Sequence, residues 1–316
     1  MAAYESKRRG ARCTPYRQWR VCGMPPPTSG GIAVLQMLGI LQNFDLAAVA
    51  PTSAAAAHLL AEAGRLAFAD RNTYVADSDF VEVPVARLID PTYLRQRAAL
   101  IDRNHAMGKA EPGKLLQKGV LIEQFEPPST THFAIVDAAG NAVSMTSSVE
   151  NAFGSRLMVR GFILNNQLTD FSFRPTVEGQ PVANRVAPGK RPRSSMAPML
   201  AFDESGALRL AVGSPGGSRI IGFVAKAVTG VLDWGLDMQA AIDLPNIVNR
   251  NGTTDLEAGT SAAALKPALE AMGHEVEVRG MVSGLHGIRI APDGRLDGGA
   301  DRRREGVALA VETPGD

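Results

Sequence analysis

The stretch Pro127-Pro128-Ser129-Thr130-Thr131-His132-Phe133 marks the point where the character of this chain changes, and the expected fold depends on it. Two consecutive prolines end any preceding helix, because proline has no backbone N–H to donate. Two runs of strand-forming residues follow, 130–137 and 141–148, joined by Ala138-Ala139-Gly140. This pattern predicts a β-hairpin whose first strand begins at Thr130. If the chain were cut before Thr130, the new α-amino group would be a base for the threonine hydroxyl, which would become a nucleophile able to form an acyl-enzyme.

The composition is that of an ordinary globular protein, because 45% of the 316 residues are hydrophobic and 21% are charged. This length suits one large domain or two modest ones. The net charge of +1 provides no field that favours nucleic acid or an anionic membrane, so we expect neither as a partner. No run of about 18 apolar residues is present, so we expect no membrane span. The basic residues near the two ends are expected on solvated surface; they are Lys7, Arg8, Arg9, Arg12, Arg17, Arg20, Arg302, Arg303 and Arg304.

Cys13 and Cys22 are the two cysteines of the sequence. Without a CxxC motif or a Cys/His cluster, we expect no metal site. Their spacing leaves open whether they form a disulfide, since bonding depends on how the fold places their Cβ atoms. The first residues carry charges with no apolar run behind them, which is not the pattern of a signal peptide.

The region before the proline pair is expected to be largely helical. A proline-rich loop at 23–31 precedes a predicted helix over about 32–43, and Ser53 is placed to cap a second helix that runs to about residue 70. Residues 78–127 are expected to combine helices with loops. The positions of the first helix that we expect to be buried are Val34, Leu35, Leu38, Ile40 and Leu41.

The region after Thr130 is expected to consist of strands paired by hairpins, with helices between them. Residues 161–166 are predicted to form a buried strand, and the proline-rich segment 173–193 is predicted to be a surface loop. The other expected elements are a hairpin around 203–206, helices over about 219–232, 238–245 and 261–272, and a hairpin within 287–296. Together they predict a layered α+β fold built on antiparallel sheets.

Three polar segments carry residue types that suit a reaction at an acyl group. Gly216 and Gly217 lie between a predicted strand and a predicted helix, where backbone N–H groups can approach a ligand and stabilise an oxyanion. Ser194 and Ser195 precede a strand and can hydrogen-bond a carboxylate. The amides and the carboxylate of 165–172 can hold an ammonium group. Taken singly, each segment is typical of an ordinary turn or loop, and the glycines match no nucleotide-binding motif.

In their order and spacing, these segments resemble the γ-glutamyltransferases (γ-glutamyltranspeptidases), a family of N-terminal-nucleophile hydrolases. The similar stretches are MPPPTSGG (24–31), LQNFD (41–45), AEAGRLAFADRNTYVADSDFVEVP (61–84), TTHFAIVDAAGNAVSMTSS (130–148), GFILNNQLTDFS (161–172), GKRPRSSMAP (189–198) and GSPGGSRII (213–221). The resemblance runs through most of the chain. It implies an αββα sandwich of stacked antiparallel sheets flanked by helices, and it implies no cofactor.

The resemblance further implies that the chain is a precursor that cleaves itself at the Ser129–Thr130 bond. The Thr130 hydroxyl would attack the preceding carbonyl, and hydrolysis of the resulting ester would free the Thr130 amine. Residues 1–129 would be the C-terminal part of the large-subunit region, mainly helical, and residues 130–316 would be the small catalytic subunit. The two fragments would remain associated without a covalent bond.

The resemblance also implies roles in the reaction. The Thr130 hydroxyl would attack the γ-amide of glutathione or a similar γ-glutamyl donor, and its α-amine, with an unperturbed pKa of about 8, would act as base. Water or an amino-acid or peptide acceptor would then take the γ-glutamyl group. The implied catalytic residues are Thr130, Ser148, which steadies the nucleophile, and the oxyanion glycines Gly216 and Gly217. The implied substrate-binding residues are Ser194 and Ser195 for the α-carboxylate, and Gln167, Asp170 and Glu150 for the α-ammonium group.

Three features depart from the family pattern. Glu150 stands where well-known members carry an asparagine, and a carboxylate there would still pair with an ammonium group while changing donor or acceptor preference. Residues 173–193 are shorter than a family lid loop and contain no tyrosine, so we expect an open cleft that admits bulkier substrates and favours hydrolysis. Met1 aligns inside the large subunit, so the arginine that pairs with the substrate carboxylate is expected to be missing. We therefore expect this chain alone to be weak or inactive and to expose apolar surface.

Two other functions stay open on the sequence. An acylase of the same fold, such as a cephalosporin (glutaryl) acylase, would use Thr130 and the same oxyanion glycines with a different acyl pocket. An unprocessed remnant would be a binding module or would have no function. Members of this family are mostly periplasmic or extracellular, so this compartment is expected here, although the start of the chain carries no export signal.

Overall fold

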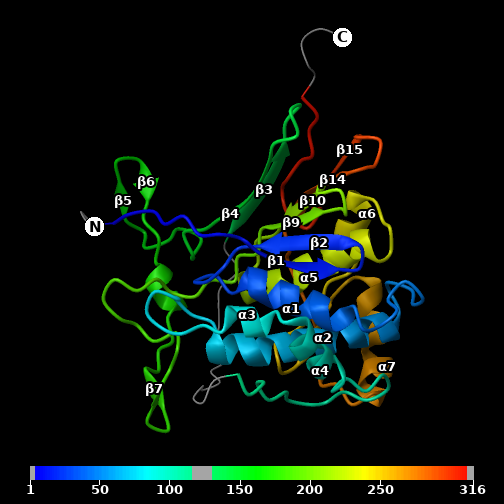
Figure 1. Ribbon diagram of the computed structural model, residues 1–316, viewed down its shortest axis with the longest axis horizontal. Coiled ribbons are helices and arrows are strands. Elements are labelled where there is room, and N and C mark those ends of the chain that lie inside the picture. Colours follow the sequence, from blue (N-terminus) through cyan, green and yellow to red (C-terminus); the bar gives the residue numbers. More distant parts are fainter. Residues whose placement is uncertain (1–3, 116–129, 312–316) are drawn as a thin grey trace.

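A computed structural model describes residues 4–115 and 130–311 of the chain. Its centre is a six-stranded antiparallel sheet in the order β1-β2-β9-β10-β14-β15 (Figure 1). The strands are β1 (Arg12–Tyr16), β2 (Trp19–Gly23), β9 (Met199–Phe202), β10 (Leu208–Gly213), β14 (His286–Ile290) and β15 (Leu296–Ala300). Segments from both sides of the Pro127-Pro128 pair therefore share one sheet.

Helices cover one face of this sheet and enclose the main core with it (Figure 1). All of α1 (Gly30–Leu41) is buried, because it packs against β1 and β2 and also against α2 (Ala54–Tyr74) and α5 (Ile220–Leu232). The sequence prediction is confirmed for these three helices. Ser53 caps α2 as predicted, its hydroxyl accepting a hydrogen bond from Ala56 N at 3.2 Å. The shorter helices are α3 (Val85–Leu88), α4 (Pro91–Ala98), α6 (Met238–Asp243) and α7 (Lys266–Ala271).

The hairpin predicted after Thr130 is present and forms a sheet of its own, β3 (Thr131–Val136) with β4 (Ala142–Ser147). It packs on β10 and β14 from the side opposite the helices. Val212 belongs to the helix-covered core, whereas a Cβ on the next residue, Gly213, would meet the ring of His132 on β3. Because neighbouring residues of a strand face opposite sides of a sheet, the hairpin lies on the uncovered side.

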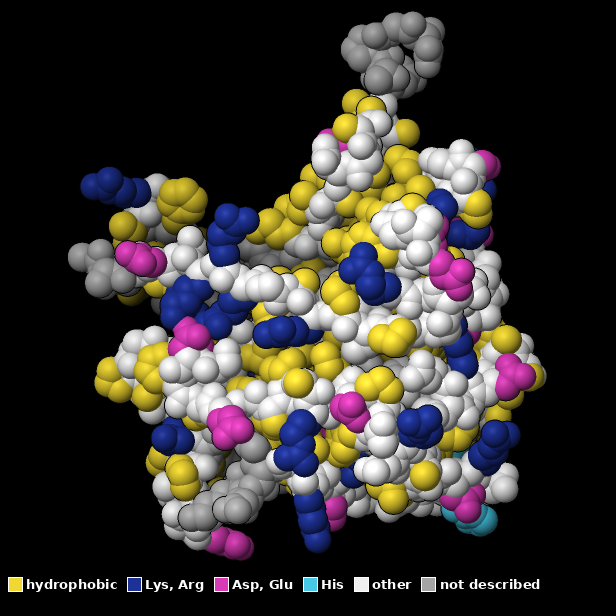
Figure 2. Space-filling model, in the orientation of Figure 1, with side chains coloured by type: hydrophobic (Ala, Val, Ile, Leu, Met, Phe, Trp, Pro, Cys, Tyr) yellow, Lys and Arg dark blue, Asp and Glu magenta, His cyan; other side chains and the backbone are white. Residues whose placement is uncertain are grey.

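The outer face of the hairpin is apolar and exposed. Ile135 and Val143 are paired across the strands, and they are 54% and 47% exposed. Phe133 and Met145 form the next pair on the same face. Figure 2 shows these strands as a projecting arm with hydrophobic atoms at its surface. The expectation that the chain exposes apolar surface is therefore confirmed.

Shorter elements complete the fold. A three-stranded sheet of β11 (Ile247–Asn249), β12 (Thr254–Glu257) and β13 (Val276–Arg279) contains a parallel pair, β12 with β13, so not every strand pairing is antiparallel as predicted. The remaining elements are β5 (Met158–Val159), β6 (Phe162–Ile163), β7 (Thr176–Val177), β8 (Gln180–Pro181) and the 3₁₀ helices η1 (Gln167–Asp170), η2 (Gly217–Arg219) and η3 (Ser261–Leu265).

The prediction of a buried strand over 161–166 is wrong. Phe162 and Ile163 pair with β5 in a small hairpin, and Phe162 is 75% exposed. A short apolar run predicts an extended segment but does not determine whether another layer covers it. The loop predicted over 173–193 carries the β7–β8 hairpin, yet its Lys190 and Arg193 are buried against the body of the protein.

The hairpin β1–β2 was not predicted from the sequence. Cys13 and Cys22 face each other across it and form a disulfide, which settles the question that their spacing left open. Several basic residues expected on solvated surface instead form ion pairs: Arg9 with Asp79 at 2.8 Å, and Arg17 with Asp233 at 3.0 Å. Among the described residues, the longest helices are too short or too polar to traverse a bilayer.

Candidate active site

Thr130 and Ser148 are brought together by the β3–β4 hairpin. The register pairs Thr131 with Ser147, so the residue before β3 lies beside the residue after β4. The Thr130 hydroxyl donates to Ser148 Oγ at 3.3 Å, and Ser148 Oγ also accepts a hydrogen bond from Glu150 N at 2.9 Å. The arrangement suits a nucleophile held by a neighbouring hydroxyl. The predicted cleavage bond reaches Ser129, which lies outside the described residues together with 116–128.

One cavity is bordered by both hydroxyls and by side chains from distant parts of the chain. All the site residues predicted from the sequence except Gly216 line it. Its lining residues are Thr130, Ser148, Glu150, Gln167, Asp170, Ser194, Ser195, Met196, Gly217 and Ile220. Loops after β4, around η1, before β9 and after β10 therefore converge on the start of β3.

Gly216 and Gly217 form the turn between β10 and α5. Their φ angles are +138° and +59°, a region that favours glycine, and a Cβ on Gly216 would lie 2.6 Å from the ring of Phe223. This turn therefore requires glycine. Gly217 lies at the cavity wall and close to the N-terminus of α5, where the helix dipole favours negative charge. The position suits an oxyanion-stabilising group.

The buried carboxylates Glu150 and Asp170 both border the cavity. Glu150 has a φ of +74°, which is uncommon for residues other than glycine, and Asn166 Nδ2 donates to its Oε2. Asp170 ends η1, and Asn184 Nδ2 donates to its main-chain carbonyl at 2.7 Å. Because buried carboxylates are stabilised by a nearby positive charge, this part of the cavity suits an ammonium group.

Arg71 of α2 contacts the serine pair and was missed by the sequence reasoning. It is 1% exposed, and it donates from Nη2 to Ser195 Oγ at 2.5 Å and from Nε to Ser29 Oγ at 2.8 Å. Ser29 Oγ in turn donates to Ser194 O at 2.7 Å. The feature that could have indicated Arg71 is an arginine within a helix that is buried on all sides, because a buried charge needs polar partners in the interior. Positive charge therefore lies next to the hydroxyls assigned to a carboxylate.

His132 lies on β3, two residues after Thr130, and it is a neutral group. Burial, with a smaller contribution from nearby His286, lowers the pKa of His132 to about 3. Its Nδ1 is 2.8 Å from Thr146 Oγ1 on β4. Its side chain is buried almost fully.

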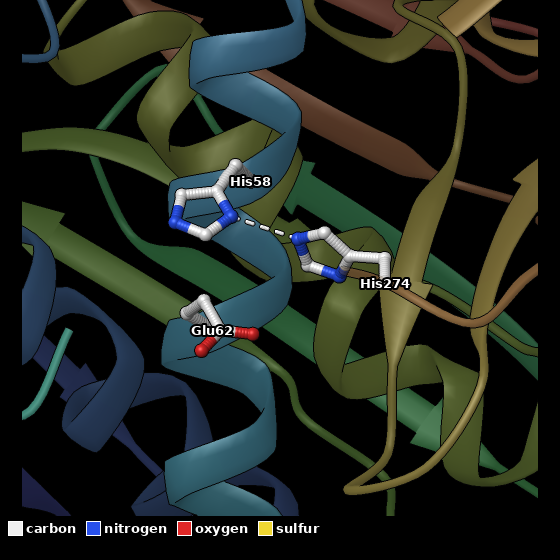
Figure 3. A group of neighbouring side chains, drawn as sticks. All are labelled: His58, Glu62 and His274. Atoms are coloured by element: carbon white, nitrogen blue, oxygen red, sulfur yellow. Dashed lines mark hydrogen bonds between the residues drawn. The ribbon is translucent and has the colours of Figure 1, made fainter. Parts of the chain in front are cut away.

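Three potential metal ligands meet on α2 and before β13, although the sequence predicted no metal site (Figure 3). They are His58, Glu62 and His274, all buried. Glu62 accepts hydrogen bonds from Arg65 Nε at 2.9 Å and from Met107 N at 3.0 Å. An arginine therefore already supplies the positive charge that balances this carboxylate.

The two imidazoles belong to a hydrogen-bonded chain that neutral histidines satisfy. His58 Nε2 is 2.7 Å from Asp102 O, so it carries the proton, because a carbonyl can only accept. His58 Nδ1 then accepts from His274 Nε2 at 2.7 Å. His274 Nδ1 accepts from Thr254 Oγ1 at 3.0 Å. Every ligand atom is engaged, so hydrogen bonding accounts for the cluster.

The layered α+β body is that of the N-terminal-nucleophile hydrolases, and Thr130 shares a cavity with the glycine turn after β10. Residues 1–311 match the family described as gamma-glutamyltranspeptidase, and the chain belongs to this family. The resemblance inferred from the sequence is confirmed.

The chain is similar to both hydrolases and acylases. The glutathione hydrolase proenzyme of Escherichia coli (strain K12) is 39% identical over 96% of this chain and 53% of its own length. The acylase ACY 1 proenzyme of Pseudomonas sp. (strain SE83) is 38% identical over 94% of this chain and 51% of its own length. The crystal structure of cephalosporin acylase from Bacillus halodurans has a TM-score of 0.84 and 25% identity, covering 99% of this chain and 55% of that chain. The chain thus spans about half the length of the curated relatives it matches.

Proposed function

We propose that this protein cleaves itself before Thr130 and then hydrolyses or transfers γ-glutamyl groups. The observation that carries the proposal is the shared cavity, in which a nucleophilic hydroxyl, a helix-start glycine, two buried carboxylates and two serines converge. A γ-glutamyl group has one carboxylate, one ammonium group and one acyl carbon. The serines suit the carboxylate, the buried carboxylates suit the ammonium group, and the Thr130 hydroxyl suits the acyl carbon. The relatives named glutathione hydrolase support glutathione or a similar peptide as the donor.

Processing would need only groups of this chain and water. Thr130 Oγ1 attacks the carbonyl carbon of Ser129, the peptide nitrogen leaves as the Thr130 α-amine, and an ester forms between the two residues. Water then hydrolyses the ester, which leaves a carboxylate on Ser129 and a free hydroxyl and amine on Thr130. Ser148 supports this role by keeping the Thr130 hydroxyl in place at 3.3 Å.

Turnover would use the same atoms again. The Thr130 α-amine takes the hydroxyl proton as Oγ1 attacks the γ-carbonyl, and it then passes that proton to the leaving amine. The oxyanion lies at the Gly216-Gly217 turn. In the ground state, Glu150, Asp170 and Gln167 hold the α-ammonium group, whereas Ser194 and Ser195, the latter bound to Arg71, hold the α-carboxylate. Water or an amine then takes the γ-glutamyl group.

A glutaryl acylase is the second candidate, because acylases are among the similar proteins. A glutaryl group lacks the ammonium group, so it would bring no donor to Glu150 Oε1, which is buried and has no hydrogen-bond partner among the described residues, and leaving this atom unpaired is costly. We therefore expect release of p-nitroaniline from γ-glutamyl-p-nitroanilide to exceed release from glutaryl-p-nitroanilide by at least about tenfold in kcat/KM. Faster release from the glutaryl compound would establish the acylase instead.

Thr130→Ala is the matched test of the nucleophile. It should abolish release from both compounds, since no other hydroxyl replaces the attacking atom. Thr176→Ala, an exposed threonine on β7, is the control and should leave the rate unchanged. Release that persists in Thr130→Ala would exclude the proposed chemistry.

We propose a periplasmic or extracellular location, supported by the Cys13–Cys22 disulfide, because such bonds persist in oxidising compartments. We also propose that fragments 1–129 and 130–316 remain associated after cleavage. The six-stranded sheet supports this, since β2 of the first fragment pairs with β9 of the second. Fractionation of producing cells tests the location, and gel filtration of processed protein tests the association.

A further inference from the structure

A second cavity is lined by three arginines and shares no lining residue with the candidate active site. It is formed by the C-terminal part of α2, by η2, by the turn after β11 and by the strands β12 and β13. Its volume of about 330 Å³ lies within the range of small-molecule sites, about 300–1,000 Å³. We call it the arginine cavity, after Arg71, Arg250 and Arg279 in its lining.

The arginine cavity lies directly behind two parts of the candidate active site. Arg71 lines the arginine cavity and donates a hydrogen bond to Ser195 Oγ, which borders the active-site cavity. Ser218 lines the arginine cavity and follows Gly217 of the glycine turn. The two cavities are therefore neighbours with separate linings.

Positive charge exceeds negative charge in the described lining of the arginine cavity, where three arginines face two acidic residues, Asp255 and Glu277. Asp255 is already engaged from outside this lining by Arg219, whose Nε and Nη2 donate to Asp255 Oδ2 at 3.0 Å and 2.8 Å. Glu277 pairs with Arg279 on the same strand. An anion in the cavity would balance the remaining positive charge.

Two of the guanidinium groups meet at the same carboxylate. Arg250 Nη2 lies 3.9 Å from Asp255 Oδ2, and Arg250 Nη1 donates to Ser218 Oγ at 2.9 Å. Arg279 Nε lies 3.1 Å from Asp255 Oδ1, yet its orientation leaves it without a hydrogen-bond partner among the described residues. Buried donors in proteins are nearly always hydrogen-bonded, so Arg279 has donor capacity that its described neighbours do not use.

The backbone that carries these arginines is held in place. Asn249 is buried, and its Oδ1 accepts hydrogen bonds from Asn251 N at 2.8 Å and from Gly252 N at 3.3 Å, which fixes the turn around Arg250. Arg279 lies on β13, which is paired with β12. Donors on a fixed backbone lose little conformational freedom when a ligand binds, so the arrangement suits a binding site.

We propose that the arginine cavity binds a phosphate group, with Arg250 and Arg279 as its main contacts. Guanidinium groups bind phosphate oxygens through paired, charge-assisted hydrogen bonds. A phosphate group presents three acceptor oxygens, which suits arginines that come from three different elements, whereas a carboxylate presents two. The ligand is free phosphate or a phosphomonoester whose organic part occupies the rest of the cavity.

Calorimetric titration of the purified chain with inorganic phosphate and with glycerol 2-phosphate tests the proposal. Sodium chloride keeps the ionic strength constant, so that general screening does not change during the titration. We expect saturable binding of one anion per chain with a Kd of about 1 mM or lower. Tighter binding of glycerol 2-phosphate would assign the site to a phosphomonoester, and equal or weaker binding would assign it to free phosphate. No saturable binding of either compound would overturn the proposal.

Arg250→Met and Arg279→Met should each weaken phosphate binding about tenfold, whereas Arg250→Lys should weaken it less because it keeps the charge. Both side chains are partly exposed, at 28% and 37%, so we expect the variants to fold, and urea unfolding checks this. Arg95→Met, which replaces an exposed arginine on α4, is the control and should bind as the wild type does. Unchanged affinity in either cavity variant, or an equal loss in the control, would overturn the proposal. Because binding is measured, the result does not depend on cleavage or turnover.

Discussion

Gly216 is a residue whose backbone, not side chain, sets the geometry of the candidate site. Its φ of +138° and the close ring of Phe223 leave no room for a Cβ. We expect Gly216→Ala to lower the free energy of unfolding by about 1–3 kcal/mol and to reduce turnover, because the adjacent Gly217 would shift. Urea unfolding and p-nitroanilide release measure the two effects.

Gly206→Ala is the matched control for that prediction. Gly206 also has a positive φ, +84°, but no atom lies within 4 Å of an added Cβ. It should cost about 1 kcal/mol or more in stability through backbone strain alone and leave turnover per folded molecule unchanged. Equal losses of activity in the two variants would contradict the role given to the Gly216 turn.

At this scale the sequence predicted most of the residues that line the cavity of the candidate site, but only as an ordered set. Taken alone, Thr130 was a strand residue and Ser194 a loop residue, since a single hydroxyl carries no signal of its function. Their convergence depends on the hairpin register and on the loop before β9. Arg71 was missed because its partner Ser195 is 124 residues away, and no local pattern connects them.

At the scale of elements, the His58–His274 chain joins parts of the fold that are distant in sequence. It connects α2, the Asp102 carbonyl, and Thr254 at the start of β12. Burial, and then the neighbouring His58 and Arg65, lower the pKa of His274 to about 4. This series of hydrogen bonds is therefore intact as long as both imidazoles are neutral.

The hydrogen bonds of His58 and His274 lead us to expect a protein that is less stable in acid. A histidine in the unfolded chain has a pKa of about 6.5, whereas that of His274 in the folded protein is about 4. The contribution of His274 to the free energy of unfolding is therefore full above pH 6.5. It is lost as the pH falls toward 4, because the unfolded state binds the proton first. His132, with its pKa of about 3, acts in the same direction. We expect His274 to account for a loss on the order of 2 kcal/mol between pH 7 and pH 4.5. Urea unfolding at the two pH values measures it.

His274→Gln should reduce that pH dependence, whereas His105→Gln should not, because His105 is an exposed side chain. Carboxylates also titrate in this range, so only the difference between variants isolates the histidine. An unchanged dependence in His274→Gln would show that the imidazole chain does not control acid stability.

Elements with strong periodicity were predictable, and those defined by tertiary partners were not. Apolar positions and a serine cap predicted α1 and α2, and turn residues predicted the β3–β4 and β9–β10 hairpins. The β1–β2 hairpin was missed because the basic residues in and before it suggested solvated surface, whereas Arg9 and Arg17 pair with Asp79 and Asp233 elsewhere in the protein. The exposure of β6 likewise depends on which neighbours cover it.

At the scale of the whole molecule, the apolar face of the β3–β4 hairpin should control solution behaviour. We expect the purified chain to bind a hydrophobic dye and to self-associate as its concentration rises, because exposed paired apolar strands attract further apolar surface. Replacing Ile135 and Val143 together with threonine should reduce both effects. Light scattering and dye fluorescence measure them.

Val186→Thr is the control, since Val186 is exposed but lies outside the hairpin. It should leave association unchanged. A wild-type chain that stays monomeric and binds no dye would show that this face is not adhesive in solution.

The whole-molecule account depends on one event, cleavage of the chain before Thr130. The fold places the Thr130 hydroxyl beside Ser148 and at the cavity that would hold the acyl group, and strands from both fragments share the central sheet. Everything proposed for turnover requires the α-amine that this cleavage frees.

Intact-mass spectrometry of the purified protein, before and after prolonged incubation, tests this most directly. The account predicts that the full-length mass is replaced by two masses, those of residues 1–129 and 130–316, and that Thr130→Ala remains a single chain. A wild-type protein that stays intact, or a Thr130→Ala variant that is cleaved at the same bond, would contradict it.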